Sequence, residues 1–153
     1  MALYNLPEFL SLLPPGSRLL GLDPGSKRIG VALSDVGLRI ASPYTTLQRS
    51  KMKFNAVEIG EIAVREGVGG LIIGLPLDGE QTLGPRAQAA RDWAHGLSDL
   101  LGLPVAMVDE SYSTAETHER LIEAGVSRAR RAEIVDKLAA AEILQRALDA
   151  LQA

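Results

Sequence analysis

Carboxylates at the ends of apolar runs are the residues of this sequence best placed to do chemistry. Asp23 ends the run RLLGLD and is followed by the turn PGS, and Asp109 and Glu110 end the run VAMVDE. In open α/β sheets ligands gather beyond the carboxyl ends of strands, so acids at these positions are candidates for a site. Side chains alternate along a strand, so Asp109 and Glu110 face opposite sides and only one can join Asp23. The residue pattern leaves that choice open.

A third candidate acid, Asp136, lies near the start of the predicted last helix. Its neighbours at i+3, i+4 and i+7 are Ala139, Ala140 and Ile143, a small apolar stripe that favours close packing on a sheet. A carboxylate on such a face needs a cation or a metal as partner. Three carboxylates suit Mg²⁺, and a pair of such ions stabilises the attacking and leaving oxygens of phosphodiester hydrolysis.

A purely structural role would also explain each acid alone. An Asp before a turn bonds the backbone there, and an Asp in an early helical turn complements the helix dipole. The sequence has no cysteine and two distant histidines, His95 and His118, to which we assign no catalytic role. A thiolate or histidine-rich metal site is therefore not expected, and any metal is held by oxygen.

The elements that must position these acids follow from periodicity and breakers. Two short Leu/Ile/Val-rich runs around the turn DPGS predict a β-hairpin, and later strands alternate with helices, which predicts parallel pairing. We predict strands at residues 18–22, 28–34, within 39–47, at 69–76 and at 105–108, and helices at 55–66, 85–100, 113–123 and 132–151. The fold class is α/β, a mixed sheet with an antiparallel meander first, parallel strands after it and helices on its faces.

Length and composition predict one domain. The chain has 153 residues, of which 46% are hydrophobic, and a formal net charge of -3. Residues 1–17 form an N-terminal extension, packed on the domain or loosely ordered, and residues 18–151 form the domain. The extension lacks a basic segment and contains three prolines, so it does not resemble an export signal. No window approaches the roughly 18 apolar residues of a membrane span, so we expect a cytoplasmic protein with no membrane partner.

Four segments together resemble the YqgF family of RNase H-like nucleases. They are LLGLDPGSKRIGVALSD, LIIGLPLDGEQTLGPRAQ, VAMVDESYSTAE and VDKLAAAEILQ, and the match spans about residues 18–148. The family is similar to Holliday-junction resolvases in fold and is described as acting in maturation of the 5′ end of pre-16S rRNA. The resemblance implies an RNase H-like sheet with helices on both faces and a metal-dependent phosphodiesterase with Mg²⁺ or Mn²⁺ as cofactor.

Carried over residue by residue, the family's acidic triad becomes Asp23, Glu110 and Asp136, as catalytic residues and metal ligands. The resemblance thus selects Glu110 over Asp109. One departure is Ser111, which stands where the family has an arginine able to grip phosphate. The loop after GLPL is also slightly shortened.

Basic residues around these acids are candidates for binding phosphates without reading bases. A further basic cluster, RSKMK at residues 49–53, has no acid partner that the sequence identifies. The candidate nucleic-acid-binding residues are Lys27, Arg28, Arg86, Arg128, Arg130, Arg131 and Lys137.

The function expected is that of a divalent-metal-dependent nuclease acting on RNA, with pre-16S rRNA favoured over DNA junctions. Two alternatives stay open: a DNA junction resolvase, and a nucleic-acid-binding ribosome-assembly factor with little catalytic power, which the Ser111 departure favours. The sequence leaves both a monomer and a homodimer open.

Overall fold

A computed structural model describes residues 3–76, 84–110 and 122–152 of the chain. A six-stranded sheet forms its centre, with strand order β1-β6-β5-β2-β3-β4. The strands are β1 (Leu3–Tyr4), β2 (Arg18–Pro24), β3 (Arg28–Ser34), β4 (Ala41–Gln48), β5 (Val68–Pro76) and β6 (Val105–Glu110). Strands β2, β3 and β4 pair antiparallel, whereas β5 pairs parallel with β2 and with β6. The predicted meander followed by parallel strands is confirmed.

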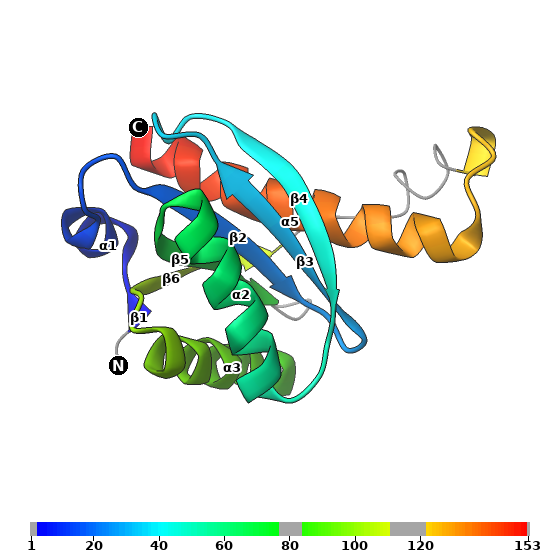
Figure 1. The fold of residues 1–153 in the computed structure, drawn as a ribbon, viewed down its shortest axis with the longest axis horizontal. Helices are drawn as coiled ribbons and strands as arrows, with labels where there is room; N and C mark the ends of the chain where they lie inside the picture. The colour runs from blue at the N-terminus through cyan, green and yellow to red at the C-terminus, as the bar shows by residue number, and fades with distance from the viewer. Residues whose placement is uncertain (1–2, 77–83, 111–121, 153) are drawn as a thin grey trace.

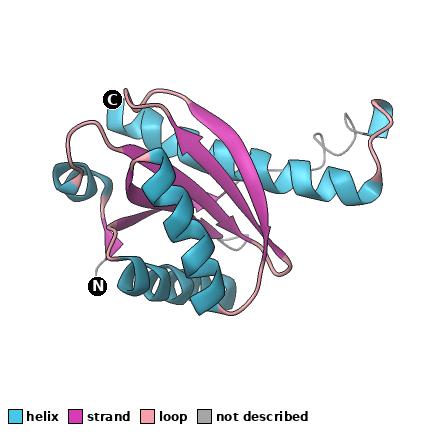
Figure 2. Cartoon of the chain, viewed as in Figure 1, coloured by secondary structure: helices cyan, strands magenta, loops and turns pink. Residues whose placement is uncertain are grey.

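Helices cover both faces of this sheet, as Figures 1 and 2 show. They are α1 (Leu6–Leu12), α2 (Met52–Glu66), α3 (Pro85–Leu101) and α5 (Arg128–Gln152). Leu20, Leu22 and Ile73 belong to the core beneath α2 and α3. Leu19 and Ile72 belong to the core beneath α5 and α1, as strand alternation requires. The RNase H-like α/β architecture predicted from the sequence is confirmed.

Two helix starts differ from prediction. Helix α5 begins at Arg128 rather than 132, so the basic residues expected in a loop form its first turn. Its start projects past the edge of the sheet, so no buried apolar stripe marks it in the sequence (Figure 1). Helix α2 begins at Met52 rather than 55. The helix expected at 113–123 falls largely outside the described residues.

The N-terminal segment packs on the domain. Strand β1 pairs parallel with β6, and Phe9 of α1 is fully buried. A Cβ added at Gly70 would lie 2.5 Å from Phe9 Cζ, so this ring sits directly on β5. No helix among the described residues is long and apolar enough to span a membrane.

Candidate nuclease site

The backbone of Asp136 lies directly on β3 beside the strand position of Asp23. A Cβ added at Gly30 would collide with the carbonyl group of Asp136, so the helix touches the strand where only a glycine fits. Gly30 is the cross-strand partner of Asp23 in the β2–β3 ladder. Paired residues on antiparallel strands have Cα atoms about 4.5–5.5 Å apart. The backbones of two acids separated by more than a hundred residues in the chain thus lie close together.

Asp23 faces the helix that carries Asp136. Leu19 packs in the core beneath α5, and a Cβ at Gly21 would lie 2.7 Å from Leu144 Cβ and 3.0 Å from Ala140 O. Residues 19, 21 and 23 share one face of β2, because alternate side chains point the same way. The absence of a side chain at Gly21 therefore lets α5 pack closely on β2. Asp23 itself is half-buried.

Asp109 lies on the opposite face from Asp23. Met107, two residues earlier, packs with the core beneath α2 and α3, so alternation places Asp109 on that face, where it is exposed. Glu110 is the last residue of β6 and pairs with Pro76 of β5. Its side chain lies outside the described part of the structure, as does the whole of Ser111. The geometry therefore argues against Asp109 as the companion of Asp23.

Asp136 also contacts a cation of its own protein. Arg28 Nε donates to Asp136 Oδ2 at 2.6 Å, and the two side chains are 28% and 26% exposed. The pair is therefore open to solvent. A carboxylate accepts several bonds through two oxygens, so this contact is compatible with a role as metal ligand. The sequence analysis expected a cation or a metal beside Asp136 but placed Arg28 among the phosphate-binding residues, so it did not predict which cation pairs with Asp136.

The donor set fits a hard divalent cation. Asp23 and Asp136 supply carboxylate oxygens, the ligands that Mg²⁺ prefers alongside water and substrate phosphates. Within residues 3–76, 84–110 and 122–152, no group of three or more acidic, histidine or cysteine side chains gathers as a metal site. In this part of the chain the backbone of Asp136 lies beside the strand position of Asp23. The side chain of the third acid of the expected triad is not described.

Replacing Arg28 is expected to tighten divalent-ion binding. Arg28→Gln removes a positive charge beside Asp136, and a like charge at this distance opposes an incoming cation. The pair is partly exposed, so we expect the dissociation constant for Mn²⁺, measured by titration calorimetry, to fall about 3- to 10-fold, or about 1 kcal/mol.

The matched control for this prediction is Arg18→Gln, which removes an ion-pair partner of Glu66 at the opposite end of β2 from Asp23. This variant should leave Mn²⁺ affinity unchanged. Weaker Mn²⁺ binding by Arg28→Gln would instead show that Arg28 chiefly orients the Asp136 carboxylate.

The other basic candidates are distributed around this end of the molecule. Lys27 lies exposed in the β2–β3 turn, and Arg86 lies exposed in the first turn of α3. Arg128 and Arg130 are exposed at the start of α5, and Lys137 is half-buried beside Asp136. Arg131 is half-buried and donates from Nη1 to Val126 O at 3.0 Å, so part of its guanidinium serves the fold.

A cleft of about 520 Å³ opens beside Asp23, on the side of α3. Its walls come from the β2–β3 turn, the end of β5 and the first half of α3. Its lining includes Asp23, Gly25, Arg49, Gly74, Arg86 and Trp93. Arg49 was not among the site residues expected from the sequence, and its signal there was the basic run without an acid partner.

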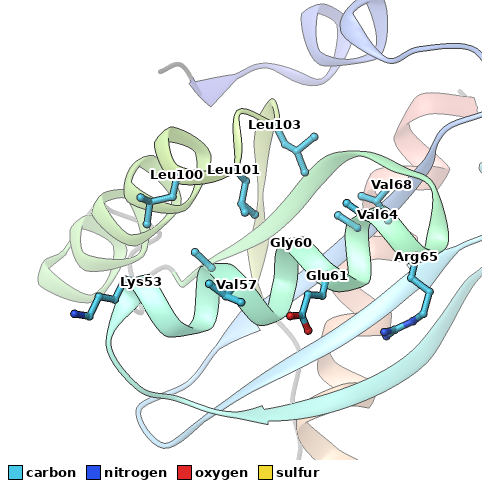
Figure 3. A pocket seen from close by; sticks show the side chains of 12 residues that line it. Lys53, Val57, Gly60, Glu61, Val64, Arg65, Val68, Leu100, Leu101 and Leu103 are labelled. Carbon is cyan, nitrogen blue, oxygen red and sulfur yellow. The ribbon is translucent and has the colours of Figure 1, made fainter.

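A second hollow, of about 770 Å³, lies between α2 and the end of α3, and Figure 3 shows the side chains that line it. Val57, Val64 and Leu100 are exposed apolar residues in its wall. None of the acids at the strand ends lines it. Its apolar character and its position exclude it as the place where Asp23 and Asp136 act.

Comparison with known proteins shows to which family this chain belongs. Residues 17–150 match a family model described as "RuvX: Holliday junction resolvase". The chain belongs to the RuvX family. A curated RuvX relative from Acidiphilium cryptum is 55% identical over 99% of this chain and 96% of its own length. A second, from Gluconacetobacter diazotrophicus, is 55% identical over 98% of both chains. Both are named "Putative pre-16S rRNA nuclease". The resemblance to the YqgF nucleases is thereby confirmed.

Solved structures show how far the fold extends beyond RuvX. The RuvC of Thermus thermophilus, in complex with a Holliday junction substrate, has a TM-score of 0.54 and 18% identity to this chain. The match covers 89% of this chain and 96% of that one. At this identity the likeness shows a shared fold, and function must be argued from the site.

Proposed function

We propose that this RuvX protein is a divalent-metal-dependent phosphodiesterase in which Asp23, Glu110 and Asp136 hold Mg²⁺ or Mn²⁺. The observation that carries this proposal is the contact of the Asp136 peptide with Gly30, the strand partner of Asp23. The position of Asp109 on the far face supports Glu110 as the third ligand. Nuclease activity is what the names of its RuvX relatives describe.

Divalent ions held here would supply Lewis-acid polarisation of the phosphate and a water of lowered pKa. The role of the protein is to position the carboxylate oxygens that would bind the ions. Asp23 is fixed by the β2–β3 ladder, and Asp136 by the seating of α5 on Gly30 and by Arg28. Rigid elements hold such groups more precisely than loops do. Asp23, Glu110 and Asp136 would hold the ions through their carboxylate oxygens.

Basic side chains would bind the nucleic-acid strand on either side of the phosphate at the acidic site. Lys27, Arg86, Arg128 and Arg130 are exposed and bind phosphates, and Lys137 and Arg131 add positive charge along α5. Arg28 serves the phosphate only when it leaves Asp136. Such contacts position a strand independently of sequence and weaken steeply with salt. The net charge of the chain is -3, so the rest of the surface attracts nucleic acid less than this basic region does.

The substrate we propose is RNA, in particular the 5′ end of pre-16S rRNA, processed in the cytoplasm. The relatives' names support this choice. A DNA junction resolvase is the second candidate, because the family model carries that description.

The test compares two substrates in one buffer. Cleavage of a pre-16S rRNA leader fragment and of a four-way DNA junction is followed with Mg²⁺, with Mn²⁺ and with EDTA. We expect metal-dependent cleavage of the RNA and little of the junction. Preferential junction cleavage would replace the RNA assignment. Binding to RNA at equal affinity without metal, with no turnover under any divalent ion, would leave a ribosome-assembly factor instead.

A further inference from the structure

Arg49 stands in the cleft beside Asp23 as a guanidinium held from two sides. Its Nη1 donates to Gly25 O at 2.8 Å, and its guanidinium carbon lies 5.8 Å from the centroid of the Trp93 ring. Its own backbone N–H donates to Lys27 O at 2.9 Å, which ties the residue to the β2–β3 turn. These contacts fix the cation in front of the strand end that carries Asp23.

The Arg49 guanidinium has hydrogen-bond donors left over for a ligand. A guanidinium carries five N–H donors, and the contact to Gly25 uses one of them. In the parts of the chain that the structure describes, no carboxylate forms an ion pair with Arg49. Trp93 is 7% exposed and offers its face to Arg49, so the ring anchors the cation and leaves it pointing into the cleft.

The cleft has the size and walls of a site for one nucleotide. Its volume of about 520 Å³ lies within the range of roughly 300–1,000 Å³ in which small ligands bind. Gly25 and Gly74 line it, so a sugar–phosphate can come close to the backbone there. Arg86 of α3 lines the same cleft and adds a second cation.

We propose that this cleft binds one unpaired nucleotide of the substrate strand, next to the phosphate at the acidic site, and that Arg49 is a positioning residue that grips its phosphate. The location beside the scissile bond rests on the proposed nuclease function. The binding itself does not, because it requires only the cleft and its two arginines. An arginine preorganised in this way suits a phosphate, which accepts two of its donors at once.

The experiment measures binding apart from cleavage. A single-stranded 12-nucleotide RNA is titrated in EDTA against the intact chain, Arg49→Ala, Arg49→Lys and the control Arg39→Ala. Arg39 is an exposed arginine at the opposite end of the strands. Trp93 is the only tryptophan of the chain, so its fluorescence reports occupancy of the cleft without a label.

We expect the RNA to change Trp93 fluorescence and Arg49→Ala to weaken binding about 10-fold. Its slope of log affinity against log salt should be shallower by about 0.7, the value for one phosphate contact on a single strand. Arg49→Lys should keep the slope and recover only part of the affinity. Arg39→Ala should behave as the intact chain.

The proposal is overturned if RNA binds without changing Trp93 fluorescence, or if Arg49→Ala matches the intact chain in affinity and slope. Should Arg49→Ala fail to fold by circular dichroism, Arg86→Ala and the Trp93 signal decide in its place. Binding in the cleft together with inactive Asp23 variants supports both proposals. If RNA binds in the cleft but is not cleaved with any divalent ion, the nucleotide-binding proposal stands and the proposed nuclease function is wrong.

Discussion

Asp23→Asn is expected to lower the rate of RNA cleavage at least 100-fold at saturating Mg²⁺. The substitution keeps the shape of the side chain and removes the charge that would hold a divalent ion. Such ions contribute several kcal/mol to stabilisation of the transition state, and each 1.36 kcal/mol is a factor of ten in rate. The measurement is single-turnover cleavage of the pre-16S leader fragment by protein purified free of host nucleases.

Two further substitutions serve as matched controls for Asp23→Asn. Asp149→Asn removes a carboxylate from the same helix as Asp136, about 20 Å farther along it, where its partner is Gln145. Asp109→Asn removes the acid that precedes Glu110 but faces away from Asp23. Both should cleave at rates close to the intact chain, whereas Glu110→Gln should fail as Asp23→Asn does.

An Asp23→Asn protein that folds normally and cleaves as fast as the intact chain would exclude the triad. If Asp109→Asn lost activity and Glu110→Gln retained it, the metal site would stand, but its third ligand would be Asp109 instead of Glu110. Melting curves of every variant separate a lost ligand from a lost fold.

The sequence predicted the described elements from β2 to α5 because their signals are local, whereas β1 and α1 in the N-terminal segment were not predicted. Breakers mark the β2–β3 turn, and Pro85 and Gly67 mark helix ends where the structure has them. The start of α5 was misplaced because its first turn projects from the sheet and carries charges instead of an apolar stripe. A periodicity argument detects the buried part of a helix only.

The candidate site could be predicted in part. Strand ends and helix spacing single out Asp23 and Asp136 without any coordinates. The Arg28–Asp136 ion pair and the anchoring of Arg49 on Trp93 join residues far apart in the chain, and no local pattern encodes them. The sequence does not distinguish Gly30 from other strand residues, because its role depends on the contact with α5. Close approach between elements is a property of tertiary packing.

Gly30→Ala is expected to destabilise the protein and disable the site together. A methyl group at this position would overlap the carbonyl of Asp136 and lie 3.1 Å from Lys137 N, so α5 has to move off β3. Overpacking of this kind costs about 1–3 kcal/mol and more where backbone must shift. For a chain of this size each kcal/mol lowers the melting temperature by about 2–4 °C. Movement of α5 also carries Asp136 away from Asp23, so Mn²⁺ affinity should fall in the molecules that remain folded.

Gly96→Ala is the control for Gly30→Ala, since it adds the same methyl group within α3. Its nearest neighbour would be Met52 Cε at 3.5 Å, an ordinary contact, and alanine favours the helix over glycine. We expect this variant to melt slightly higher than the intact chain and to bind Mn²⁺ equally well. The contrary result would be a Gly30→Ala protein with the same melting temperature as Gly96→Ala and full Mn²⁺ affinity. A methyl group would then fit between β3 and α5, and the close packing of α5 on β3 would not be what brings the two acids together.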